Sequence, residues 1–68
     1  MVNTNKLKAM IVEKGITQTS LSGKLGLSIQ GLNKKLNGRS PITLDEAYTL
    51  IDLLEIQDPV EIFFARIS

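Results

Sequence analysis

Glycine and proline divide this chain into five short segments, and each segment carries apolar residues at helical spacing. In the first segment Leu7, Met10 and Ile11 recur at i, i+3 and i+4 before Gly15, which indicates a helix over about residues 5–14. No stretch shows the sustained two-residue alternation of a strand. The sequence therefore predicts an all-α fold, a bundle of five helices of roughly 7–12 residues joined by short loops.

Residues that favour helix N-caps stand at the start of the other four segments: Thr17, Ser28, Thr43 and Asp58. We expect these helices to span about residues 17–25, 28–37, 43–54 and the stretch from 58 onward. Glu46 and Glu61, three residues after the last two caps, have the spacing of capping boxes. Carboxylates at a helix start also suit the helix dipole, so they have a structural explanation that we prefer to a catalytic one.

The chain is short and lacks two reactive residue types. Its 68 residues are expected to form a single domain, residues 1–68, with a thin core. Without cysteine there is neither a disulfide framework nor a Cys-ligated zinc site, and without histidine the commonest metal ligand and general base is missing. An enzyme is therefore a poor hypothesis, and neither a metal nor a cofactor is expected.

Membrane insertion and secretion are also not expected. No apolar run approaches the ~20 residues of a membrane-spanning helix. The first residues, "MVNTNKLK", lack the apolar stretch of a secretory signal. Together with the absence of cysteine, these features favour a cytoplasmic protein without a membrane partner.

Charge is distributed unevenly along the chain. Residues 1–40 contain seven basic residues and one acidic residue, whereas residues 41–68 contain one basic and six acidic residues. This asymmetry favours a polyanionic partner for the first part of the chain and a second part held away from that partner. Two solvated faces of opposite sign explain the same distribution, and charge alone leaves both interpretations open.

The helices expected over residues 17–25 and 28–37 are separated by a very short break. Gly26 can adopt the left-handed conformation that ends one helix, and Ser28 can cap the next, with Leu27 between them turned towards the core. Two helices joined in this way form the helix-turn-helix arrangement, whose second helix is free to enter a DNA major groove.

A helical wheel divides the second of these helices into two faces. At ~100° per residue, Leu32 and Leu36 share the buried stripe. The opposite face and its flank carry amides, a lysine and an isoleucine: Gln30, Lys34 and Asn37 on the face, Ile29 and Asn33 on the flank. The segment contains no acidic residue, although a helix that merely faced water would gain from Glu–Lys pairs. Because these side chains can pair with base edges or a thymine methyl, the face is predicted to contact DNA.

Each of these side chains also has an ordinary explanation. Gln30 and Asn33 are typical surface residues, and Ile29 can equally well edge the core. Lys34 and Lys35 can be a solvated pair on the outer side of the helix. The DNA interpretation depends on their combination on one exposed face of a helix that follows a glycine turn.

The segment "TQTSLSGKLGLSIQGLNKKLNG", followed by "TLDEAYTLIDLLEI" and "PVEIFF", resembles the phage repressor and Cro-like helix-turn-helix domains, often called the XRE family. The resemblance covers about residues 5–64. Its most specific marks are Thr17-Gln18 at the start of the second helix, Gly26 at the turn, Leu32 and Leu36 inside the third helix, and Asn37-Gly38 at its end.

The resemblance implies roles for particular residues. In that family the Gln that opens the second helix binds a backbone phosphate, which indicates Gln18 beside Thr17. The Asn that ends the third helix commonly meets phosphate as well, which indicates Asn37, and Arg39 suits a phosphate clamp. Positions early in the third helix read bases, and these are Ser28, Ile29, Gln30, Asn33 and Lys34. The ordinary alternatives are an exposed first-turn residue for Gln18 and a helix stop for Asn37.

One departure from the family pattern affects stability. Where the family usually has a small apolar residue between the two helices, this chain has Ser22, followed by Gly23. The Ser22 hydroxyl needs a partner, for which a backbone carbonyl one turn earlier is available. Since Gly23 also weakens the second helix, we expect a less stable helix-turn-helix of unchanged geometry.

The resemblance implies a transcriptional regulator that binds double-stranded DNA at the nucleoid, a repressor of phage or mobile-element type whose third helix reads the major groove. With nothing else attached to the chain, regulation is expected to work through occupancy of an operator. The apolar residues near the end either close the core or, as we expect, also form a weak homodimer contact: Val60, Phe63, Phe64 and Ile67. The alternative function is a protein-interaction module on the same fold, an antitoxin or antirepressor that docks a partner through its acidic helices.

Overall fold

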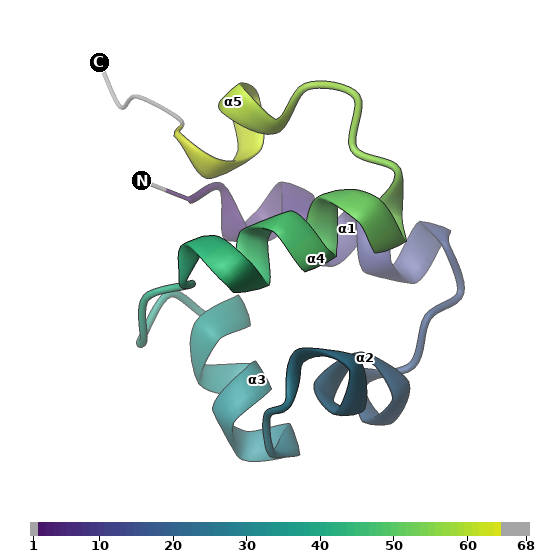
Figure 1. The fold of residues 1–68 in the computed structure, drawn as a ribbon, viewed down its shortest axis with the longest axis vertical. Helices are drawn as coiled ribbons and strands as arrows, with labels where there is room; N and C mark the ends of the chain where they lie inside the picture. The colour runs from purple at the N-terminus through teal and green to yellow at the C-terminus, as the bar shows by residue number, and fades with distance from the viewer. Residues whose placement is uncertain (1, 65–68) are drawn as a thin grey trace.

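The computed structural model describes residues 2–64, which contain five helices and no strand (Figure 1). The helices are α1 (Thr4–Glu13), α2 (Gln18–Leu25), α3 (Ile29–Leu36), α4 (Leu44–Leu54) and α5 (Pro59–Phe63). The predicted all-α fold is confirmed, and the bounds of the first four helices lie within one residue of those expected. α5 is shorter than predicted, with 5 residues.

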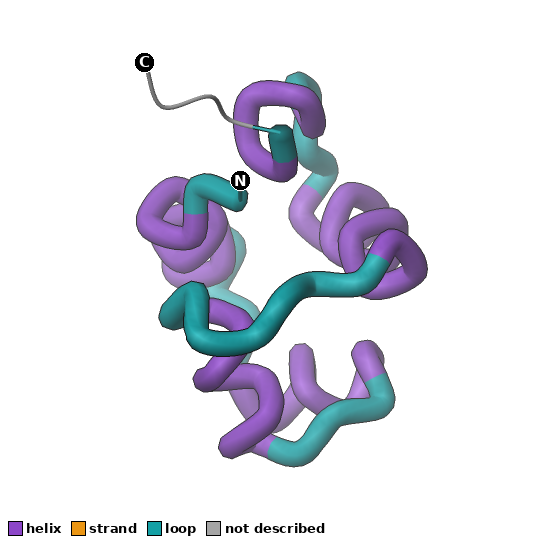
Figure 2. Tube along the Cα trace, turned by 90° about the vertical axis from the view of Figure 1, so that its left-hand side faces the viewer, coloured by secondary structure: helices purple, strands orange, loops and turns teal. Residues whose placement is uncertain are grey.

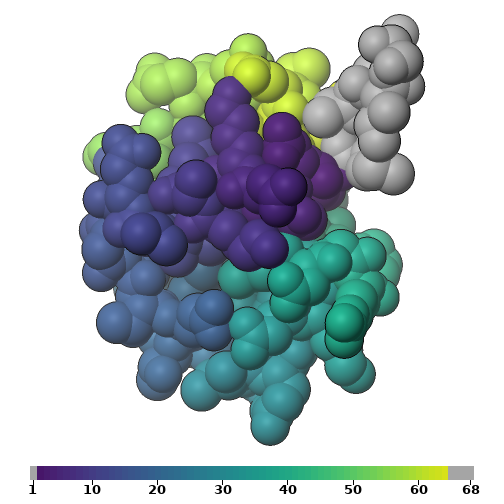
Figure 3. Space-filling model, turned by 180° about the vertical axis from the view of Figure 1, so that it is seen from behind, coloured from purple at the N-terminus to yellow at the C-terminus, as the bar shows by residue number. Residues whose placement is uncertain are grey.

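The helices are arranged in three levels. α1 and α4 lie across the middle, α5 lies at one end, and α2 and α3 lie at the other, as Figure 1 and Figure 2 show from two sides. Apolar side chains from all five helices and from the α4–α5 loop form one core: Leu7, Ile11, Leu21, Leu32, Leu36, Ala47, Leu50, Leu54, Ile56, Ile62 and Phe63. α3 packs against α1, and α2 packs against α4 and α3. The α2–α3 pair thus forms one end of the molecule, below α1 in Figure 3.

Every helix begins with a side chain that accepts a hydrogen bond from the backbone of the first turn: Asn3, Thr17, Ser28, Thr43 and Asp58. The capping box of Thr43 and Glu46 is present in full, as predicted. The second predicted box is wrong, because only the bond from the Glu61 amide to Asp58, at 3.3 Å, is formed. The Glu61 carboxylate pairs instead with Lys6 of α1, a charged donor from a distant part of the chain.

A residue with positive φ closely follows each of the first four helices: Gly15, Gly26, Gly38 and Glu55. In each case the amide of the next residue donates to a carbonyl five residues back, at 2.8–3.2 Å, which is the Schellman arrangement. After α1, α2 and α4 that next residue is apolar and packs on the core: Ile16, Leu27 and Ile56. After α3 it is the exposed Arg39, so the Schellman turn at this one helix end presents a cation to solvent.

Candidate nucleic-acid interface

The turn between α2 and α3 is built from two adjacent caps. Gly26 has a φ of 69°, and the amide of Leu27 donates to the Ser22 carbonyl at 2.9 Å. Leu27 packs against the core, as predicted. The Ser28 Oγ then accepts from the Gly31 amide at 3.0 Å and starts α3. A Cβ on Gly31 would lie 3.2 Å from that oxygen, so the missing side chain leaves room for the cap.

The hydroxyl of Ser22, the residue that departs from the family pattern, has the backbone hydrogen-bond partner that the sequence predicts. It is 5% exposed, and its hydroxyl donates to the Thr19 carbonyl at 2.9 Å. The small polar side chain therefore fits between the helices without an unpaired hydroxyl.

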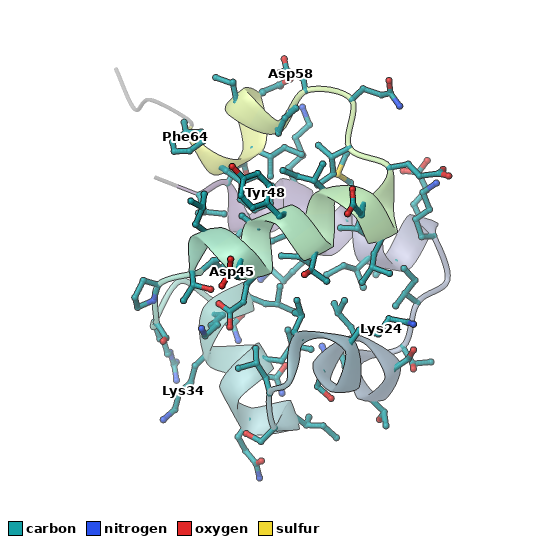
Figure 4. All side chains as sticks on the ribbon, in the orientation of Figure 1. Lys24, Lys34, Asp45, Tyr48, Asp58 and Phe64 are labelled. Atoms are coloured by element: carbon teal, nitrogen blue, oxygen red, sulfur yellow. The ribbon has the colours of Figure 1, made fainter. Side chains whose placement is uncertain are left out.

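α3 turns one face into the core and the other to solvent. Leu32 and Leu36 are 1% and 2% exposed, whereas Ile29 is 44% exposed. Gln30 and Lys34 are exposed, and Asn33 is half-buried at the flank. In Figure 4 the Lys34 side chain extends away from α3 into solvent. The helix thus presents amide and lysine groups without an acidic neighbour on the same helix.

Lys35 does not belong to this exposed face. Its Nζ donates to both carboxylate oxygens of Glu46, at 2.6 and 2.8 Å, and the two side chains are only 15% and 12% exposed. The interpretation of Lys34 and Lys35 as a solvated pair is therefore wrong, because Lys35 lies on the side of α3 that adjoins α4. Burial alone raises the pKa of Glu46, but the hydrogen bonds from Lys35 and Thr43 together outweigh it and hold this pKa below its ordinary value.

The starts of α2 and α3 keep hydrogen-bonding capacity for an outside ligand. The Thr17 Oγ1 accepts from the Ser20 amide at 3.1 Å, and the exposed Gln18 is the first residue of α2. A hydroxyl that accepts one hydrogen bond can still donate another. Thr17 and Ser28 can therefore each cap a helix and donate to DNA at the same time. The free amides of a helix N-terminus favour an anion at both places.

The end of α3 brings together two residues expected from the sequence and one that was not. Asn37 is exposed, and its Oδ1 accepts from Lys8 Nζ of α1 at 3.2 Å, so its amide nitrogen is free to donate outward. Arg39 follows two residues later and is exposed. Lys8 escaped sequence reasoning because the contact joins residues 29 positions apart, and only its place in the basic first part of the chain hinted at a role.

Within residues 2–64, three ion pairs join the basic first part of the chain to the acidic second part: Lys6–Glu61, Lys14–Glu55 and Lys35–Glu46. Among residues 2–64, the basic residues without a carboxylate partner are Lys8, Lys24, Lys34 and Arg39. Part of the charge asymmetry thus serves to join the helices. Figure 4 places Lys24 and Lys34 at the α2–α3 end and Asp58 at the α5 end.

A metal-binding cluster and a membrane-spanning helix are both absent from the part of the chain that the structure describes. It contains no group of three or more His, Cys, Asp or Glu residues that could hold a metal ion. None of its helices has the length and apolar character needed to cross a membrane.

Comparison with known proteins agrees with this geometry. A protein-family model described as a Cro/C1-type HTH DNA-binding domain matches residues 6–64. The match covers α2, the turn, α3 and every residue that the sequence had indicated for DNA contact. No curated protein and no solved structure matches the chain.

Proposed function

The chain belongs to the Cro/C1-type helix-turn-helix family of DNA-binding domains, and on this basis we propose that it is a sequence-specific transcriptional regulator. In this proposal α3 reads the major groove of double-stranded DNA. The protein represses a phage or mobile-element gene by occupying its operator, in the cytoplasm and at the nucleoid. Catalysis has no part in this function, since the family is one of DNA-binding domains.

One observation carries the proposal: the outer face of α3 is exposed and free of acidic residues. Gln30 and Asn33 have amides that can donate to and accept from adenine, and Lys34 can donate to guanine. Ile29, at 44% exposure, is available to contact a thymine methyl. An acidic side chain on this face would repel DNA. The absence of acidic residues therefore favours a face that binds DNA over a face that only contacts solvent.

The phosphate contacts are assigned to residues around that face, Thr17, Gln18, Asn37 and Arg39, while Ser28 stays among the base-reading positions. We add Lys8 to this group, because its Nζ lies 3.2 Å from the Asn37 Oδ1 and it lacks a carboxylate partner within residues 2–64. Such contacts fix the orientation of the protein on the duplex but carry no sequence information. Sequence preference is then left to α3.

Selection of bound duplexes from random DNA tests the proposal. We expect enrichment of one sequence, with affinity that falls steeply as salt rises because phosphate contacts release counterions. A two-fold dimer would select half-sites about one helical turn, ~34 Å, apart. Failure to enrich any sequence, or binding that is insensitive to salt, would refute it.

We also propose a weak homodimer, formed at least on DNA, through the exposed part of α5 and its end. Val60 and Phe64 are 64% and 63% exposed. Phe63, which the sequence suggested for the same surface, is 6% exposed and belongs to the core, and Ile67 lies outside the described residues.

The mass in solution at high concentration and on DNA measures this association. Phe64→Ser should weaken it, whereas Val12→Ser, at the 79% exposed Val12 of α1, is the matched control. A strict monomer on a single half-site would contradict the dimer.

A second candidate function has its own observation. Leu44 and Tyr48 of α4 are 62% and 59% exposed and lie among acidic residues such as Asp45 and Asp52. A protein partner docked there would make the chain an antitoxin or antirepressor. That function gains if neither Gln30→Ala nor Lys34→Ala changes DNA affinity.

A further inference from the structure

The Glu46 carboxylate joins the last turn of α3 to the first turn of α4. Its Oε1 accepts from Lys35 Nζ at 2.6 Å and from the Thr43 amide at 2.8 Å, and its Oε2 accepts from the same Nζ at 2.8 Å. The Thr43 hydroxyl in turn accepts from the Glu46 amide at 3.2 Å. One carboxylate therefore fixes the start of α4 and, through Lys35, the end of α3.

The surroundings of this pair are apolar. Lys35 and Glu46 line the same small space as apolar side chains from α2, α3, α4 and the preceding loop: Leu25, Leu32, Leu36, Ile42 and Leu50. The other two ion pairs are more exposed, with side-chain exposures of 41% and 55% for Lys6–Glu61 and of 39% and 72% for Lys14–Glu55. Only the Lys35–Glu46 pair is largely withdrawn from water, so among the three it holds the most defined geometry.

Stability alone is a weak reason for such a pair, because a buried ion pair often contributes no more than apolar residues of similar volume. What it supplies is a fixed geometry. Lys35 lies in the same turn as Asn33 and Lys34, in the helix that also carries Gln30. Any roll of α3 about its axis would move Gln30 and Asn33 relative to the bases they are assigned to read.

Base contacts and phosphate contacts respond differently to such a roll. Bidentate hydrogen bonds to base edges need donor–acceptor distances near ~2.9 Å and good angles. Attraction to phosphates is long-ranged and tolerates a tilted helix. Loosening α3 should therefore reduce discrimination between sequences more than it reduces affinity for DNA in general.

We propose that Lys35 and Glu46 are positioning residues that determine DNA specificity without touching DNA. The pair fixes the angle of α3 against α4, and it also keeps the Lys35 ammonium from contacting phosphates. This inference rests on the proposed function, because it concerns how α3 reads DNA.

Three variants test it: Glu46→Gln, Lys35→Met and the double variant Lys35→Met/Glu46→Gln. Gln retains the shape of Glu and can keep the capping bond to Thr43, and Met approximates the Lys stem. The matched control is Lys14→Met/Glu55→Gln, which removes an exposed ion pair that is 2.6 Å long and does not involve α3. Affinities for the selected operator and for a random duplex are measured beside thermal melting.

Each of the three variants should lower the ratio of operator to random-DNA affinity by about fivefold or more, while the control leaves this ratio unchanged. Glu46→Gln should also bind random DNA more tightly with a steeper salt dependence, since Lys35 becomes available to phosphates. The double variant contains no unpaired buried charge, so its melting temperature should recover towards that of the parent while its ratio stays low.

A ratio that recovers together with melting temperature, or that never changes, would show a merely structural pair and overturn the inference. If a single variant fails to fold, the double variant still decides. A different result would refute the proposed function itself: a parent protein that shows no preference for any DNA sequence. The inference about Lys35 and Glu46 would then be refuted as well.

Discussion

At the scale of single residues, Gln30 and Lys34 of α3 face solvent, whereas Lys35 and Lys8 each contact a residue outside their own helix. The ~100° helical repeat placed Gln30 and Lys34 outward and Leu32 inward, and the structure agrees. The alternative of Lys34 and Lys35 as a solvated pair is wrong, because adjacency in sequence carries no information about the Glu46 carboxylate on another helix. Lys8 was missed for the same reason, since its neighbour Asn37 is brought to it only by tertiary packing.

The outer face of α3 gives a paired prediction. Gln30→Ala should relax the preference for one base pair at a cost of about 1–3 kcal/mol on the operator alone. Lys34→Ala should weaken binding to both operator and random DNA, because its charge attracts phosphates, with a further loss on the operator, where Lys34 donates to guanine. Competition titrations against duplexes mutated at single positions separate the two effects. Equal behaviour of both variants on every duplex would contradict the assigned roles.

Lys8 gives a prediction that concerns salt. Lys8→Gln should lower the slope of log affinity against log salt by about 1, because one phosphate contact is lost. Lys6→Gln is the matched control, since Lys6 is already paired with Glu61. Titrations at several salt concentrations give both slopes, and identical slopes would remove Lys8 from the interface.

At the scale of helices, the cap residues explain why most helix bounds could be predicted from the sequence. Thr17, Ser28 and Thr43 cap the helices that their sequence positions indicated. Glu55 gave no such signal, because a left-handed φ of 52° is uncommon at a residue other than glycine. The Glu61 box failed because Lys6, distant in sequence, offers its carboxylate a charged partner.

Two glycines, one inside α2 and one at its end, should respond to alanine in opposite directions. A Cβ added to Gly23 would have no heavy atom within 4 Å and the residue has no positive φ, so Gly23→Ala should stabilise the protein by about 1 kcal/mol through helix propensity. Gly26→Ala should destabilise it by about 1–2 kcal/mol, because its φ is 69°. Urea unfolding measures both changes in the free energy of unfolding. The same sign for both variants would contradict this assignment of α2 and its end.

The contact between α3 and α4 predicts a dependence on pH. Although burial opposes it, hydrogen bonding by Lys35 and Thr43 holds the pKa of Glu46 below its ordinary value of 4.5. A carboxylate whose pKa is lower in the folded state contributes stability above pH 4.5, and this contribution is lost as pH falls through the folded value.

Unfolding measured from neutral to acid pH tests this dependence. The deficit of Glu46→Gln relative to the parent protein should be largest at neutral pH and should shrink below pH 4.5. A deficit that is constant with pH would show that the Glu46 charge does not contribute.

At the scale of the whole molecule, the basic residues of the α2–α3 end and the exposed apolar residues of α5 lie far apart. Lys24, Lys34 and Arg39, which have no carboxylate partner in the described part of the chain, lie on α2, α3 and the turn that follows. The exposed Val60 and Phe64 lie on α5 and directly after it. The sequence shows this polarity only as a difference in net charge between residues 1–40 and residues 41–68. It does not show which lysines keep their charge free for a ligand, because the ion pairs that neutralise three of them form only in the fold. This arrangement agrees with the proposal that one end binds DNA and the other a second copy of the chain.

In the proposed function, the α2–α3 end binds DNA through the outer face of α3. Titration of the protein with its selected duplex, followed residue by residue through backbone amide NMR shifts, tests it most directly. We expect the largest changes at the start of α2 and over residues 28–39, with a random duplex shifting chiefly the phosphate-contacting positions. Largest changes on α4 and α5, with α3 unperturbed, would contradict it.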